Sequence, residues 1–302
     1  MKLLKKIIAV FLLVLILVLV GGYFYFDQKF TPEENYLTVQ NESGKIPIFW
    51  LGNDKNVLLL PVHFKGNPET YYLQFDTGSP YTIFYSEPIK SIKEISVDNE
   101  RAKTSFQIGT TEISSVKFRI FESKKSENDS VKIIGTLGAD ILENRKTIIN
   151  FKENNVVFNI SNEPENFKSN LFDFKFKKRK IIIPAFLKGE KEKFLYDSGT
   201  SAFELLTTKE IWKDLKLPDS KVTIEKSQSW QNVLTTYTAN CSQNIRFQSK
   251  EIPLNNVTYV EGFSQTQYSL MKFSGMTGML GNKIFLKNSI YIDGLNNKIG
   301  IE

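Results

Sequence analysis

The amino-acid sequence predicts a mostly β protein with two similar β-rich lobes, preceded by one N-terminal transmembrane helix. Three observations lead to this prediction. Several short motifs occur twice in the same order, the runs between them alternate like β-strands, and a long uncharged apolar stretch lies close to the N-terminus.

The N-terminal stretch has the length and flanking charges of a membrane anchor. Lys2, Lys5 and Lys6 precede an uncharged run of 20 residues from Ile7 to Phe26, which is long enough to cross a bilayer as a helix. The lysines predict a cytoplasmic N-terminus with the rest of the chain outside. The alternative is a cleaved signal peptide, but Gly21-Gly22 is a poor cleavage site. We expect a retained anchor in a single-pass protein of the cell membrane, periplasmic or otherwise extracytoplasmic if bacterial.

The remaining boundaries follow from composition. Polar residues surround Pro164 and predict a linker, while runs such as Lys117–Phe121 alternate at period two and predict strands. We divide the chain into a cytoplasmic tail (1–6), a transmembrane anchor (7–26), a polar stalk (27–45), an N-terminal lobe (46–160), a linker (161–172) and a C-terminal lobe (173–302).

The lobes are predicted from a repeat. Asp76-Thr77-Gly78-Ser79 and Asp197-Ser198-Gly199-Thr200 have the same chemistry and lie 121 residues apart. Leu58–Gly66 precedes the first motif as Ile181–Gly189 precedes the second, and Gly135–Gly138 is matched downstream by Gly278–Gly281. Four landmarks in a common order, the last being the strand-like runs Thr147–Phe158 and Ser289–Gly300, indicate two copies of one fold.

The repeated carboxylates suggest a chemistry. Asp76 and Asp197 each follow an apolar run and precede a glycine, as expected for an acid held at a tight turn. Two carboxylates about 3 Å apart cannot both ionise, so the pair shares a proton. Such a pair contains both a general base and a general acid, which is enough to activate water against an amide.

Over roughly residues 50–302 the chain resembles the aspartic peptidases. The paired lobes resemble the pepsin-like, single-chain branch, whereas Gly135–Leu142 resembles the retropepsin-like branch. The resemblance implies an acid protease architecture in which Asp76 and Asp197 are catalytic. It also implies three pairs of supporting residues. Thr77 and Ser198 would brace the two loops, and the hydroxyls of Ser79 and Thr200 would hydrogen-bond the carboxylates. Gly138 and Gly281 would pass beneath the catalytic loops, whose turns contain Gly78 and Gly199.

The chain departs from the pepsin-like pattern in its flap. No Trp follows the first motif in Pro80–Tyr85, and no Tyr-Gly hairpin is recognisable. The nearest flap candidate is the polar turn at Asp98–Arg101. Trp230 is an aromatic candidate in the second lobe, with a core or surface position as the alternative.

Composition excludes several other classes. One cysteine, Cys241, cannot form an internal disulfide, and we interpret it as a small buried residue. The single histidine, His63, lies in an apolar run and is read as a strand residue, so histidine-based nucleophilic or zinc sites are not expected. The net charge is +6. Three lysines precede the apolar run, and the residues after the run include 36 basic and 33 acidic side chains. We read the basic run Lys177–Lys180 as a solvated strand edge.

The sequence therefore predicts a membrane-anchored aspartic endopeptidase without cofactor or metal. We expect a monomer that acts on peptide or protein substrates near the membrane, contacts the bilayer through residues 7–26 and binds no nucleic acid. The alternative is a catalytically inactive bilobal binding protein of the cell envelope.

Overall fold

The computed structural model describes residues 2–122, 131–229, 232–262 and 275–302. Its contacts separate residues 1–34 from residues 35–302, and the two units are described in turn.

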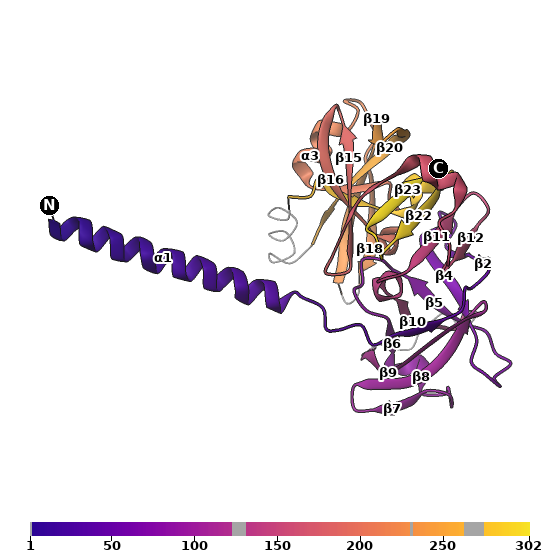
Figure 1. The fold of residues 1–302 in the computed structure, drawn as a ribbon. Coiled ribbons are helices and arrows are strands. Elements are labelled where there is room, and N and C mark those ends of the chain that lie inside the picture. Colours follow the sequence, from indigo (N-terminus) through magenta and orange to yellow (C-terminus); the bar gives the residue numbers. More distant parts are fainter. Residues whose placement is uncertain (1, 123–130, 230–231, 263–274) are drawn as a thin grey trace. The chain divides into compact units, whose positions relative to one another are not determined.

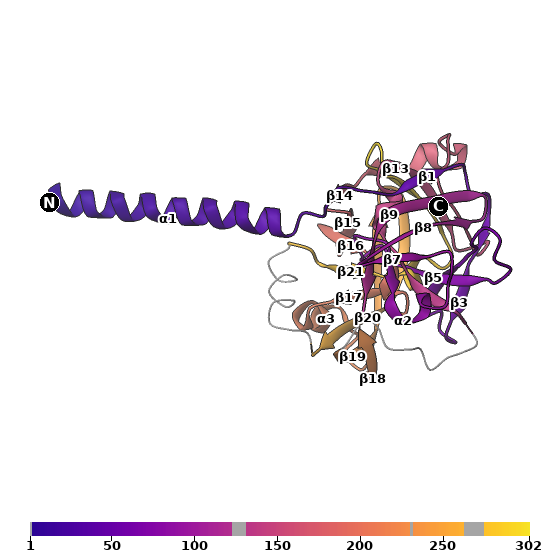
Figure 2. The ribbon, with the colours of Figure 1, turned by 90° about the horizontal axis from the view of Figure 1, so that it is seen from below.

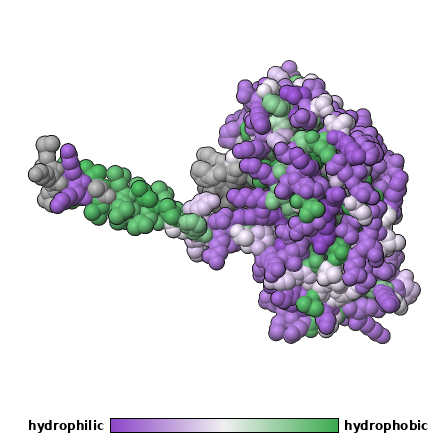
Figure 3. Space-filling model, viewed as in Figure 1, coloured by the Kyte–Doolittle hydropathy of each residue, from purple (hydrophilic) through white to green (hydrophobic). Residues whose placement is uncertain are grey.

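The first unit is a single helix, α1 (Lys2–Lys29). Within its span Leu4–Lys29, an 18-residue window has a mean hydropathy of 3.0 and no buried residues, and most of the helix is green in Figure 3. Among the described residues it is the one helix that is long and apolar enough to cross a membrane.

The second unit contains the repeat as two sheets (Figures 1 and 2). In the described residues, the first sheet has the order β3 (Phe49–Leu51), β4 (Val57–Val62), β5 (Tyr71–Phe75), β10 (Ile133–Leu137), β6 (Ile83–Tyr85), β9 (Thr111–Phe121), β8 (Arg101–Ile108) and β7 (Ser96–Asp98), and β1 (Thr38–Gln40) pairs with β9. The second has the order β14 (Lys175–Lys177), β15 (Lys180–Leu187), β16 (Glu190–Tyr196), β21 (Gly278–Leu280), β17 (Leu205–Thr207), β20 (Lys250–Glu261), β19 (Asn232–Phe247) and β18 (Thr223–Ser229).

The two sheets have the same pattern of strand directions. β5 and β10 are parallel, as are β16 and β21. β6 is antiparallel to β10 and parallel to β9, and β17 has the same relations to β21 and β20. The predicted mostly β fold with two similar lobes is therefore confirmed.

Short helices connect these strands. They are α2 (Ser86–Ile89), η1 (Ala139–Leu142), η2 (Glu165–Asn170), η3 (Ser198–Thr200), α3 (Lys209–Leu215) and η4 (Asn282–Phe285).

A third sheet joins the halves of the chain. Its order is β13 (Leu171–Asp173), β23 (Lys298–Ile301), β22 (Ser289–Asp293), β11 (Lys146–Asn150), β12 (Asn155–Val157) and β2 (Ile46–Pro47). The central pair is antiparallel β11 and β22, one strand from each half, with Thr147 opposite Ile292. The closing landmarks of the two repeats thus pair with each other.

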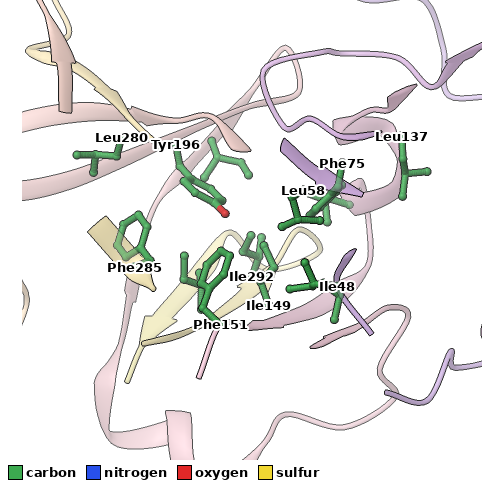
Figure 4. Close-up of a cluster of buried hydrophobic side chains, with 14 of the residues drawn as sticks. Ile48, Leu58, Phe75, Leu137, Ile149, Phe151, Tyr196, Leu280, Phe285 and Ile292 are labelled. Carbon is green, nitrogen blue, oxygen red and sulfur yellow. The ribbon is translucent and has the colours of Figure 1, made fainter. Parts of the chain in front are cut away.

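The main hydrophobic core is continuous across both lobes and the third sheet. In Figure 4, Phe75 and Leu137 of the first lobe and Tyr196 and Phe285 of the second lie around Ile149 and Ile292 of the third sheet. Phe75 and Tyr196 directly precede the two motif aspartates, so the strands that deliver the carboxylates are fixed by one core.

The segment predicted as a stalk, 27–45, is partly folded. α1 extends to Lys29, and Thr38–Gln40 forms β1 against β9. The side chain of Asn35 donates to the carbonyl of Asp140 at 2.8 Å. The prediction of a polar stalk did not take Leu37 and Val39 into account, and both side chains pack against the main core.

The segment predicted as a linker, 161–172, is also structured. It contains η2, and its last residues begin β13, which pairs with β23. Phe167 is buried against Tyr291, with ring centroids 5.5 Å apart, so two aromatic rings hold this segment on the third sheet.

Candidate active site

The two motif aspartates occupy equivalent positions at the ends of paired parallel strands. Asp76 follows β5, and its amide donates to the carbonyl of Leu137 on β10 at 3.0 Å. Asp197 follows β16, and its amide donates to Leu280 on β21 at 2.9 Å. The backbone of each aspartate is therefore fixed by its own lobe.

Backbone amides within each motif bind the carboxylates. The amides of Gly78 and Ser79 donate to Oδ1 of Asp76 at 2.9 and 3.2 Å. The amide of Gly199 donates to Oδ1 of Asp197 at 2.8 Å. These bonds orient the acids and favour their charged forms.

The motif glycines show that the two loops face each other. A Cβ at Gly78 would lie 2.6 Å from the carboxylate oxygens of Asp197, and one at Gly199 would lie 2.5 Å from Oδ1 of Asp76. Each glycine thus lies against the acid of the other lobe. A larger residue at either position would push the opposite carboxylate away.

Reciprocal hydrogen bonds brace the two loops, as the resemblance implies. The amide of Thr77 donates to Oγ of Ser198 at 2.9 Å, and the amide of Ser198 donates to Oγ1 of Thr77 at 2.9 Å. The two hydroxyls then donate onward to the carbonyls of Tyr196 and Phe75, at 3.1 and 2.8 Å. Both side chains are buried, so loss of one partner would leave unsatisfied groups.

The expectation for the hydroxyls of Ser79 and Thr200 is wrong. Oγ of Ser79 donates to the carbonyl of Tyr81, and Oγ1 of Thr200 donates to the carbonyl of Asp197, both at 2.8 Å. Short hydroxyls commonly bond to nearby backbone in this way at turns. Ser79 reaches Asp76 through its amide instead.

Gly138 and Gly281 allow close backbone contact with the motif loops. A Cβ at Gly138 would lie 2.3 Å from the carbonyl of Tyr81, and one at Gly281 would lie 2.1 Å from the carbonyl of Thr200. The amide of Ala139 donates to Ser79 at 2.8 Å. The strands ending at these glycines therefore support the loops directly, as the resemblance implies.

The two carboxyl groups are coupled. Burial raises the pKa of Asp76. Burial, followed by the neighbouring charge of Asp76, raises the pKa of Asp197 to about 8. The interaction between the two side chains lowers the pKa of Asp76 and raises the pKa of Asp197, the directions expected when Asp76 ionises first and Asp197 keeps its proton. Two neighbouring acids whose pKa values are separated in this way are expected to lose their protons in two steps.

A buried acid supports the first motif loop and was not singled out as a site residue from the sequence. Asp140 accepts the amide of Thr82 at 2.6 Å and its hydroxyl at 2.7 Å. Burial raises the pKa of Asp140 to about 6, although the bonds from Thr82 and the charge of Arg179 oppose the rise. The sequence signal was the acid two residues after Gly138.

Arg179 contacts the same loop from the second lobe, which contradicts its reading as part of a solvated edge. Its side chain is 3% exposed and pairs with Glu143 at 2.9 Å. Its Nη1 donates to the carbonyl of Pro80 at 3.3 Å, and its guanidinium lies 5.3 Å from the ring of Tyr81. Arg119 lies 3.8 Å from the same ring. The tight turn between β14 and β15 directs one member of the basic run inward.

The second motif loop has a neutral support. Asn282 is buried, accepts the hydroxyl of Tyr196 at 2.7 Å and donates to the carbonyl of Ser198 at 3.3 Å. The two lobes thus share topology but differ in the charge behind their motifs.

The hairpin that contains the predicted flap candidate differs in length from the β18–β19 hairpin of the second lobe. The polar turn at Asp98–Arg101 joins β7 to β8, and β7 has three residues. In the second lobe β18 has seven residues and pairs with β19. Trp230, the aromatic candidate of the second lobe, lies outside the described residues.

The remaining polar candidates lie in structural positions. His63 is exposed and bridges Gln107, and Cys241 is buried as expected. In the part of the chain that the structure describes, no group of three or more His, Cys, Asp or Glu residues could hold a metal ion.

Comparisons with known proteins identify a structural likeness. No family model and no curated sequence matches the chain. Among solved structures, the aspartic proteinase from Irpex lacteus is similar with a TM-score of 0.51 and 12% sequence identity, over 86% of this chain and 97% of that chain. At this identity the likeness shows a shared pepsin-like fold.

Proposed function

We propose that this chain is an aspartic endopeptidase that hydrolyses peptide bonds with water activated between Asp76 and Asp197. The observation that carries the proposal is the placement of the two acids, each against the motif glycine of the other lobe, on loops joined by the reciprocal hydrogen bonds of Thr77 and Ser198. The pepsin-like fold agrees with it.

The higher pKa of Asp197, which the charge of Asp76 raises, supports a division of roles. Asp76 is the ionised acceptor and takes a proton from water, whose oxygen attacks the peptide carbonyl carbon. Asp197 gives its proton to the carbonyl oxygen, which yields a tetrahedral diol. Collapse of the diol breaks the C–N bond as Asp76 gives its proton to the leaving nitrogen and Asp197 takes a proton from one diol hydroxyl, which restores both acids. No side chain forms a covalent bond, so no acyl-enzyme accumulates.

The alternative is a binding protein that keeps the bilobal fold without catalysis. A binding scaffold needs neither a shared proton nor glycines pressed against the opposite acids. The chain retains both aspartates, both glycines and the reciprocal bonds of Thr77 and Ser198. This set favours the enzyme.

For the domains we propose a cytoplasmic tail (1–6), a transmembrane anchor (7–26), a connecting segment (27–34) and a folded part that begins at Asn35 and contains both lobes. A retained α1 would place residues 1–6 in the cytoplasm and both lobes outside. Eight residues separate Phe26 from Asn35, and even fully extended they reach roughly 30 Å. Substrates would then be membrane proteins or exported chains close to the bilayer.

Cleavage of a peptide library by the full chain in detergent tests the proposal. Asp76→Asn and Asp197→Asn should each reduce turnover by about 10²–10⁴-fold, the usual size of a general acid–base contribution. Asp214→Asn is a matched control, because Asp214 is 62% exposed and pairs with Lys188 on the surface. Near-normal turnover by Asp76→Asn would exclude the mechanism. A statine-type inhibitor should block peptide cleavage by the wild type.

A further inference from the structure

The sheet faces beside the two motif loops can be compared position by position. On β5, Leu73 and Phe75 belong to the main core, so Gln74 between them faces the other side. Thr136 on β10 pairs with Gln74 and with Ile83. These residues form the non-core face of the first lobe directly before Asp76.

The second lobe has the same register with different side chains. Met279 on β21 pairs with Leu195 and Leu206, while its neighbour Leu280 lies in the main core. Met279 is therefore the counterpart of Thr136, and Leu195 the counterpart of Gln74. Any difference between the faces comes from the side chains.

The first face is polar. The hydroxyls of Tyr85 and Thr136 form a hydrogen bond of 2.9 Å. Burial raises the pKa of Tyr85, and the charge of Asp76 adds to the rise, which places the phenol within electrostatic reach of that acid. Two hydroxyls use one of their two protons in a mutual bond, so the pair keeps a donor for a further acceptor. Tyr85 and Gln74 are partly exposed.

The second face is apolar. Leu206, Leu234 and Val260 form a hydrophobic cluster separate from the main core. Phe203 and Met279 pack against this cluster and are partly exposed. Phe203 follows the second motif by three residues, so the cluster adjoins Asp197 in the chain as well as across the sheet.

We infer that the site selects an unlike pair of side chains across the reacting bond, with a polar, hydrogen-bonding residue toward Tyr85 and Thr136 and an apolar residue toward Phe203 and Met279. The cleavage part of this inference rests on the proposed function, whereas the selection concerns binding. An apolar side chain on the first face would leave the hydroxyl donor without an acceptor. A polar side chain on the second face would be desolvated without a partner.

Four peptides with identical flanks test the selection in the full chain in detergent. Their central pairs are Asn-Leu, Leu-Asn, Leu-Leu and Asn-Asn. One of the two mixed orders should be cleaved about tenfold faster, as kcat/KM, than the other three, because tenfold corresponds to about one net hydrogen bond. Equal rates within twofold, or a preference for Leu-Leu, would overturn the inference.

Variants at matched positions assign the faces. Met279→Thr gives the second face the residue that Thr136 provides in the first. This variant should cleave the Asn-Asn peptide faster than the mixed peptide that the wild type prefers. Tyr85→Phe with Thr136→Val removes both hydroxyls and should favour Leu-Leu. Thr136→Ser retains a hydroxyl and should retain the wild-type order, which separates hydrogen bonding from a packing effect.

A binding arm separates this inference from the proposed function. Fluorescence anisotropy with the Asp76→Asn variant measures affinity for the same four labelled peptides without cleavage. If the wild type cleaves none of them but the variant binds one mixed order about tenfold more tightly, the endopeptidase proposal fails and the selection stands. If none is cleaved and none is bound, both fail.

Discussion

Removal of one acid from the coupled pair should stabilise the protein at neutral pH. Asp197→Asn replaces the protonated donor by an amide of the same shape that can still donate to Asp76. In the wild type the pKa of Asp197 is raised from 3.8 to about 8. Between these values the folded state holds a proton that the unfolded state releases, so this group loses stability as the pH rises.

The magnitude follows from proton linkage. One extra proton in the folded state changes the free energy of unfolding by about 1.4 kcal/mol per pH unit. Between pH 5 and pH 7 the wild type should therefore lose roughly 2–3 kcal/mol relative to Asp197→Asn. For a protein of this size that difference corresponds to about 5–10 °C in melting temperature.

Thermal unfolding of the full chain in detergent at pH 5, 6 and 7 measures the effect. The quantity to compare is the difference between variant and wild type, because other acids such as Asp140 contribute equally to both. Asp214→Asn should show no such trend, since Asp214 is exposed. A constant difference across this pH range would refute the shared proton.

Three further predictions concern the support of the site. Thr77→Val should lower stability by about 2–4 kcal/mol in denaturant unfolding and reduce turnover, because the amide of Ser198 and the carbonyl of Tyr196 lose buried partners; unchanged stability would contradict the bracing role. Arg179→Met should raise the pKa of Asp140 above about 6, since the arginine charge lowers it, and NMR titration of that carboxyl group would show a fall or no change if the contact is unimportant. Membrane fractionation with N-terminal sequencing should recover α1 in the mature protein, and a soluble species beginning near Tyr23 would instead indicate a cleaved signal sequence.

The repeated sequence predicted the two matched lobes more fully than the contacts of single side chains. Glycines at positions 78, 138, 199 and 281 marked close backbone approaches because glycine alone tolerates them. The order of matched landmarks then implied matched sheets. The bounds at each end of the first lobe were less accurate, because a few apolar residues such as Leu37 and Phe167 fold segments that are polar on average.

The hydrogen-bond partners of the motif hydroxyls could not be predicted from the sequence. Ser79 and Thr200 have hydroxyls close in sequence to an acid, yet nearby carbonyls bind them instead. The burial of Arg179 could not be predicted, because three nearby lysines favour an exposed strand edge. The fold directs the arginine side chain inward, where it is 3% exposed. Such choices depend on tertiary contacts that composition does not encode.

The third sheet has a consequence for when the site can form. β23 (Lys298–Ile301) lies between β13 and β22. Completion of that sheet therefore requires residues 298–301, and the partner of β11 lies about 145 residues later in the chain. Pairings so distant in sequence form slowly. A nascent chain would thus carry both aspartates for some time before they meet, and a truncation of the final five residues would leave β13 without its neighbour.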